Sequence, residues 1–94
     1  MKKITLIKMN GCPYCASALR AIEALKEETP AYAALSIDII DENEQPTLAQ
    51  PYATDYYYVP TFFVAGQKIY EAHPGDDDAT IKTAVQKVFQ TALA

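Results

Sequence analysis

The chain has 94 residues, a length that fits one domain and leaves little room for a second. Hydrophobic residues make up 50% of it and only three residues are glycine, which argues against a disordered or low-complexity protein. The formal net charge is −4 and the longest basic run is the pair Lys2–Lys3, so we expect neither nucleic acid nor an anionic membrane as a partner.

The N-terminal segment has too short an apolar stretch for a targeting or membrane signal. The stretch runs from Ile4 to Ile7 and ends at Lys8. A secretory signal needs about 7–15 apolar residues and a membrane span about 20. We therefore expect a cytoplasmic protein in which residues 1–94 form a single domain.

The first half of the chain alternates between strand and helix patterns. Residues 3–8, rich in Ile and Thr, predict a strand that ends at the turn-forming Asn10-Gly11. A helical period begins at Pro13, and Thr29-Pro30 ends it because the residue before a proline disfavours the helical region. Alternation over 35–39 predicts a second strand. The apolar face of the helix comprises Cys15, Ala18, Leu19, Ile22 and Leu25.

The second half predicts a short helix, a hairpin and a final helix. The short helix covers 47–53, with Pro51 kinking or shortening it. Strands at 61–64 and 68–71 flank a short turn. The aspartates at 76–78 provide an N-cap and favourable charge for a last helix. Its apolar face comprises Ile81, Ala84, Val85, Val88, Phe89 and Ala92.

The predicted order of elements is β-α-β-α-β-β-α, an α/β fold. A strand–helix–strand unit makes a right-handed crossover between parallel strands, whereas the late hairpin is antiparallel. A mixed four-stranded sheet with helices on both faces satisfies both constraints.

The two cysteines are spaced Cys-x-x-Cys at the start of the first helix. With Cys12 as the N-cap and Pro13 at the first helical position, the Cys12 sulfur sits at an exposed helix tip, near unpaired N–H groups and the positive end of the helix dipole. Both features favour the thiolate, which is the reactive form. We therefore assign Cys12 as the attacking nucleophile and Cys15 as the resolving thiol.

Half of a zinc site is the main alternative interpretation of such a pair. The only other good soft ligand is His73, so a four-ligand site within one chain is not available and we assign no metal ligands. A metal- or iron–sulfur-binding module that uses Cys12 at a subunit interface stays open. So does a protein-interaction domain without turnover.

Two motifs resemble a known family. Cys12-Pro13-Tyr14-Cys15 is identical to the active-site tetrapeptide of dithiol glutaredoxins, and Val59-Pro60 stands where thioredoxin-fold proteins have a cis-proline opposite the cysteines. The resemblance covers essentially the whole chain. It implies a thioredoxin fold and a glutaredoxin-like thiol–disulfide oxidoreductase.

The resemblance also implies binding residues. Pro60, in the cis form, would hold an extended substrate or glutathione backbone, and Val59 would supply main-chain hydrogen bonds. Further candidates for contacts with substrate or glutathione are Lys8, Tyr14, Asp76 and Asp77. The expected enzyme transfers electrons to protein or glutathione mixed disulfides. It needs no bound cofactor because the two sulfurs carry the electrons.

The chain departs from the glutaredoxin pattern in three places. Met9 takes the position of the usual lysine, and Tyr58-Val59-Pro60 replaces the family's Thr-Val-Pro. Tyr70-Glu71 stands where the family's glutathione-binding Gly-Gly-x-Asp-Asp begins. Glutathione, as co-substrate, and a thioredoxin-reductase-type flavoprotein therefore both stay open as electron donors. The run Tyr56-Tyr57-Tyr58 is expected mainly to cover the sheet, with a docking surface for partner proteins as the alternative.

Overall fold

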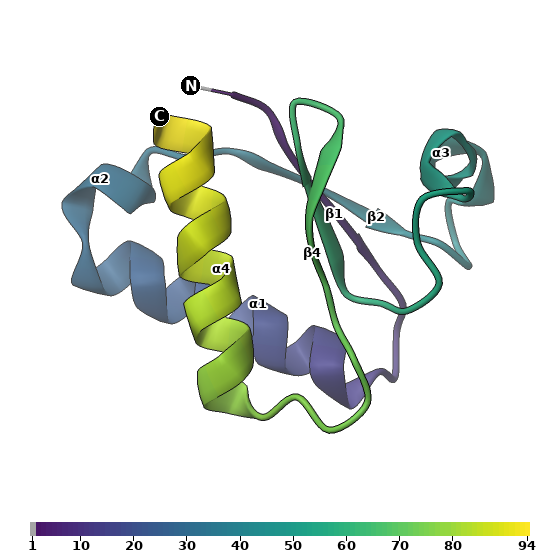
Figure 1. Ribbon diagram of the computed structural model, residues 1–94, viewed down its shortest axis with the longest axis horizontal. Coiled ribbons are helices and arrows are strands. Elements are labelled where there is room, and N and C mark those ends of the chain that lie inside the picture. Colours follow the sequence, from purple (N-terminus) through teal and green to yellow (C-terminus); the bar gives the residue numbers. More distant parts are fainter. Residues whose placement is uncertain (1) are drawn as a thin grey trace.

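The computed structural model describes residues 2–94 and contains one four-stranded sheet with its helices (Figure 1). Its elements in chain order are β1 (Ile4–Lys8), α1 (Pro13–Glu28), α2 (Pro30–Ala33), β2 (Ile37–Asp41), α3 (Pro46–Ala49), a 3₁₀ turn (Gln50–Tyr52), β3 (Thr61–Val64), β4 (Gln67–Glu71) and α4 (Asp78–Leu93).

The sheet has the strand order β2-β1-β3-β4. Strand β1 pairs in parallel with β2 and antiparallel with β3, and β3 and β4 form the antiparallel hairpin. The hairpin turn uses Ala65 and Gly66, both with positive φ, as the tight two-residue turns of hairpins require. The mixed four-stranded sheet predicted from the sequence is therefore confirmed.

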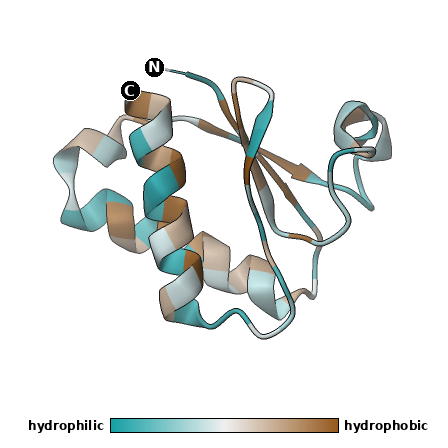
Figure 2. Cartoon of the chain, in the orientation of Figure 1, coloured by the Kyte–Doolittle hydropathy of each residue, from teal (hydrophilic) through white to brown (hydrophobic). Residues whose placement is uncertain are grey.

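Helices cover both faces of the sheet, as the sequence predicts. Helices α1 and α4 pack together on one face, and α3 lies on the other side (Figure 1). Because side chains of a strand alternate between faces, Ile4 and Leu6 of β1 enter the α1–α4 core while Ile7 enters the opposite one. Figure 2 shows hydrophobic residues concentrated in the inner strands of the sheet, whereas the start of β4 is hydrophilic.

The smaller core lies between the sheet and the segment that leads to β3. It contains Ile7, Ile40, Ala49 and Phe63, and the half-buried Tyr56 and Val59 pack against it. Anchoring Val59 in this core fixes the chain immediately before Pro60, opposite the start of α1. The smaller core thus supports one side of the candidate site.

Two predicted elements differ from the observed ones. The predicted helix over 47–53 is divided into α3 and a 3₁₀ turn that contains Pro51, because a proline lacks the N–H that a continuing helix needs. The strand predicted over 35–39 starts two residues later, at Ile37, because Leu35 closes the turn of α2 by donating its N–H to the carbonyl of Tyr32. The sequence patterns did not predict α2.

Within residues 2–94, every helix falls short of the length and apolar character that crossing a lipid bilayer demands.

Candidate active site

The loop between β1 and α1 places two cysteines at the start of a helix. Gly11 turns the chain with a φ of 78°, Cys12 is the N-cap in extended conformation and Pro13 begins the helix. The backbone N–H of Cys15 donates to the Cys12 Sγ at 3.2 Å. A sulfur thus occupies the place where an N-cap oxygen usually accepts from the first turn, as the sequence pattern predicts.

Both cysteines are free thiols, but their surroundings differ. Cys15 is 2% exposed and Cys12 is 8% exposed. Cys12 is therefore less accessible than the exposed helix tip expected from the sequence. The reason is a distant segment, because the Cys12 Sγ faces the carbonyl of Val59 at 3.8 Å.

The pKa of the Cys15 thiol is raised to about 12. Burial is the largest cause, and the hydrogen bond with the Cys12 side chain adds to it. The backbone of Met9 and the charge of Lys8 act in the opposite direction with smaller effect. Cys15 therefore carries its proton at neutral pH.

The segment opposite the cysteines contains a cis peptide bond between Val59 and Pro60, which confirms the predicted cis-proline. Pro60 is buried directly before β3, and the Thr61 hydroxyl donates to the carbonyl of Tyr58 at 2.6 Å. The Val59 carbonyl accepts from the Cys12 thiol. The structure thus brings Val59 and Pro60 to the cysteine loop.

Lys8 is held on the β2 side of the cysteine loop. Its Nζ donates to the Asn10 side chain at 2.8 Å and lies 3.5 Å from an Asp41 carboxylate oxygen. The same carboxylate accepts from the backbone N–H of Asn10 at 3.1 Å. Asp41 thereby braces the loop that carries Cys12. Sequence reasoning missed Asp41, although it ends β2 directly opposite Lys8 in the strand register.

Asp41 keeps its charge in this position. The N–H of Glu44 lowers the pKa of the Asp41 carboxyl most, and the N–H of Asn43 and the Lys8 ammonium lower it further against the opposing effect of burial. An ionised Asp41 is the form that pairs with Lys8.

Tyr14 connects the cysteine motif to the loop between β4 and α4. Its hydroxyl accepts a hydrogen bond from the backbone N–H of Gly75 at 2.9 Å. This loop runs past the start of α1 (Figure 1). Tyr14 thus packs against the α1–α4 core and holds the β4–α4 loop through its hydroxyl.

Asp76 and Asp77 both accept hydrogen bonds from residues that are close to them in the sequence. Asp76 accepts from the Tyr70 hydroxyl at 2.5 Å and from the N–H of His73 at 3.0 Å, and these contacts lower the pKa of its carboxyl. Asp77 caps α4 by accepting from the N–H of Thr80 at 2.8 Å, which lowers the pKa of its carboxyl. Both carboxylates therefore have structural roles.

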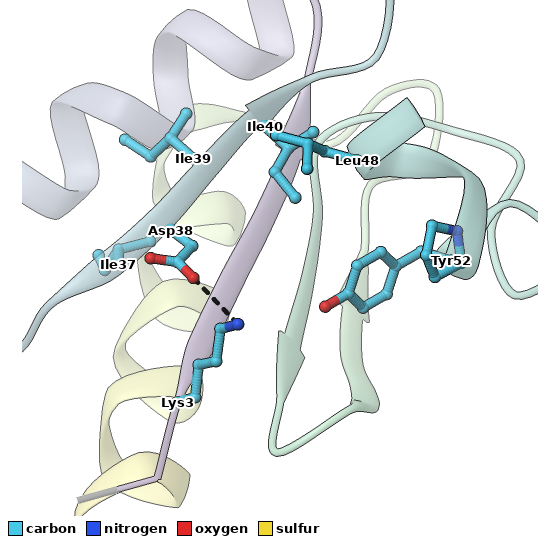
Figure 3. A pocket seen from close by; sticks show the side chains of 8 residues that line it. Lys3, Ile37, Asp38, Ile39, Ile40, Leu48 and Tyr52 are labelled. Atoms are coloured by element: carbon cyan, nitrogen blue, oxygen red, sulfur yellow. Dashed lines mark ion pairs between the residues drawn. The ribbon is translucent and has the colours of Figure 1, made fainter. Parts of the chain in front are cut away.

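Among residues 2–94, no three His, Cys, Asp or Glu side chains gather in a way that would hold a metal ion. The residues that line a separate cavity of about 520 Å³ at the β2 edge include neither cysteine. Figure 3 shows this cavity beside β2, with the Lys3–Asp38 ion pair of 3.1 Å at its border.

Comparison with known proteins gives structural matches but no sequence matches. No protein-family model and no curated protein matches the chain. A mutant thioredoxin from Halobacterium salinarum NRC-1 superposes with a TM-score of 0.55 at 22% identity, covering 94% of this chain and 74% of that one. A thioredoxin from Malassezia sympodialis gives 0.58 at 25% identity, covering 93% and 78%. The chain therefore has the thioredoxin fold, with its two cysteines close together at the start of α1.

Proposed function

We propose that this protein is a thiol–disulfide oxidoreductase that reduces protein or glutathione mixed disulfides through Cys12 and Cys15. One observation carries the proposal: the Cys12 sulfur accepts the N–H of Cys15 at the tip of α1 and faces the Val59–Pro60 segment. The thioredoxins among the structural matches support the same class of chemistry.

The two sulfurs have different roles because their surroundings differ. Cys12 is the N-cap of α1, and its sulfur accepts the N–H of Cys15 and faces the Val59 carbonyl of the opposite segment. Burial keeps Cys15 protonated, with a pKa of about 12. Cys12 is therefore the nucleophile and Cys15 the resolving thiol.

The exchange takes place in two steps. The Cys12 thiolate attacks a substrate disulfide, so a Cys12–substrate S–S bond forms while the substrate bond breaks, and the departing thiolate takes up a proton. Cys15 then loses its proton and attacks the Cys12 sulfur. The intramolecular disulfide forms and the second substrate thiol leaves, which completes the transfer of two electrons.

A reductant must restore the dithiol. We propose that two equivalents of glutathione, or a thioredoxin-reductase-type flavoprotein, reduce the Cys12–Cys15 disulfide in the cytoplasm. The exchange requires no bound cofactor, since the sulfurs themselves carry the electrons.

Turnover assays with single cysteine variants test this function. The protein, Cys12→Ser and Cys15→Ser are each assayed with a protein disulfide and with a glutathione mixed disulfide, in the glutathione and flavoprotein reducing systems. Cys12→Ser should abolish turnover of both substrates. Cys15→Ser should lose reduction of the protein disulfide and retain that of the mixed disulfide. Full activity of Cys12→Ser would reject the assigned nucleophile, and a metal-dependent absorption spectrum of anaerobically purified protein would favour the shared-metal alternative.

A further inference from the structure

A row of three aromatic side chains lies beside the Val59–Pro60 segment. The rings of Tyr57 and Tyr58 meet edge to face at 4.8 Å, and the Tyr58 ring lies 6.4 Å from the His73 ring. Tyr57 is 83% exposed and Tyr58 40% exposed. Of the tyrosine run, only Tyr56 is half-buried against the sheet. We call these three residues, Tyr57, Tyr58 and His73, the aromatic row.

Glu71 holds the backbone of this row in place. One of its carboxylate oxygens accepts the N–H groups of both Tyr57 and Tyr58 at 2.7 Å, and the other pairs with the Lys68 ammonium at 2.8 Å. Burial opposes ionisation, but these contacts outweigh it and lower the pKa of Glu71 to about 2. The exposed rings therefore stand on a fixed backbone, which reduces the entropy lost when a partner binds.

Two members of the row, Tyr58 and His73, are connected to the cysteine site through the backbone. Tyr58 directly precedes Val59, whose carbonyl faces the Cys12 sulfur. His73 belongs to the β4–α4 loop, which is joined to Tyr14 through the N–H of Gly75. A polypeptide whose cysteine reacts at Cys12 would have its neighbouring residues beside these rings.

The charges around the aromatic row favour one kind of polypeptide partner. The faces of tyrosine rings attract cationic side chains. The exposed carboxylates of Asp55 and Asp77 lie close in sequence to the two ends of the row, and Asp76 accepts the N–H of His73. The chain as a whole carries a net charge of −4. A basic peptide segment is therefore attracted, whereas glutathione, a net anion, is not.

We propose that the aromatic row is the docking surface for polypeptide substrates that carry a lysine or arginine next to the reacting cysteine, and that Glu71 is its positioning residue. This inference rests on the oxidoreductase function proposed above. Among protein substrates, it favours those with basic residues around their disulfides.

Two synthetic peptides test the substrate preference. They are identical except that the cysteine, held in a mixed disulfide, is flanked by lysine in one and by glutamate in the other. The unaltered protein should reduce the lysine peptide with a kcat/KM at least about threefold higher than that for the glutamate peptide, because its KM for the lysine peptide is lower. A threefold difference is about the size expected for one exposed cation–π contact. Tyr57→Ala should remove most of this preference and leave reduction of 2-hydroxyethyl disulfide within twofold.

Leu48→Ala is the matched control, because Leu48 is 52% exposed and lies at the β2 cavity (Figure 3). Equal kcat/KM values for the two peptides would overturn the proposed docking surface. So would a Tyr57→Ala variant that loses peptide turnover and 2-hydroxyethyl disulfide turnover equally. Absence of turnover of every disulfide by the unaltered protein, in both the glutathione and the flavoprotein reducing systems, would instead reject the oxidoreductase function itself.

A double-mutant cycle tests the role of Glu71. Glu71→Gln should raise KM for the lysine peptide about threefold with kcat unchanged. If Glu71 acts through the row, the variant that combines Glu71→Gln with Tyr57→Ala should be no worse than Tyr57→Ala alone. Losses that multiply in the double variant, or a fall in kcat for all substrates, would show that Glu71 does not position the row.

Discussion

Two loops meet at the start of α1, and they use their polar groups differently. In the cysteine loop, the Cys12 sulfur faces the Val59 carbonyl across the site. In the β4–α4 loop, Asp76 and Asp77 accept hydrogen bonds from residues at most six positions away in the sequence. Both loops carry residues that a motif assigns to function. The difference teaches that a motif residue is a good candidate for chemistry when its reactive group is directed at the site.

The largest expected effect is in the reactivity of the two thiols. Because the pKa of Cys15 is raised to about 12, it is protonated throughout the neutral range and becomes a thiolate only near that pH. At pH 8 its thiolate fraction is on the order of one in ten thousand, so iodoacetamide should label Cys12 and leave Cys15 unlabelled. Peptide mapping by mass spectrometry measures both rates.

The unfolded protein in urea is the control for this labelling, and both cysteines should react there at similar rates. Labelling of Cys15 as fast as Cys12 in the folded protein at pH 8 would remove the asymmetry on which the assignment of nucleophile and resolving thiol depends.

A moderate effect is expected from acid on the segment held by Glu71. Its folded pKa of about 2 lies below the ordinary value of 4.5, so its ionised contacts stabilise the fold above pH 4.5. That contribution is lost as the pH falls from 4.5 through about 2. The Tm of Glu71→Gln should therefore fall less steeply than that of the unaltered protein over this interval. Parallel Tm curves would show that Glu71 contributes no acid-sensitive stability.

The smallest effects are expected in the β4–α4 loop. Asp77→Ala removes the N-cap of α4 and should lower the Tm by a few degrees, because the N–H of Thr80 loses its partner. The KM for glutathione should change less than twofold in this variant. A large rise in that KM with an unchanged Tm would show that Asp77 binds glutathione and is not mainly a cap.

Local patterns predicted much of this structure. The Cys-Pro start of α1, the tight turn of the hairpin and the one-sided apolar face of α4 each depend on residues that are close in sequence. The cis bond before Pro60 came from a family resemblance, since position alone also permits an ordinary trans proline.

The remaining features depend on contacts between distant segments. Val59 covers Cys12 from 47 residues away, and Gly75 reaches Tyr14 across 61 residues. Neither contact produces a periodic pattern in the sequence from which it could be predicted. The burial of Cys12 and the structural use of Asp76 therefore became visible only in the fold.

The most direct check of the two cysteine roles is trapping of mixed disulfides. Cys15→Ser and Cys12→Ser are each incubated with the same protein disulfide, and the covalent adducts are quantified by mass spectrometry. Cys15→Ser should accumulate an adduct through Cys12, while Cys12→Ser should form almost none because Cys15 is buried and protonated. Equal adducts on the two variants, or an adduct only through Cys15, would contradict Cys12 as the attacking sulfur.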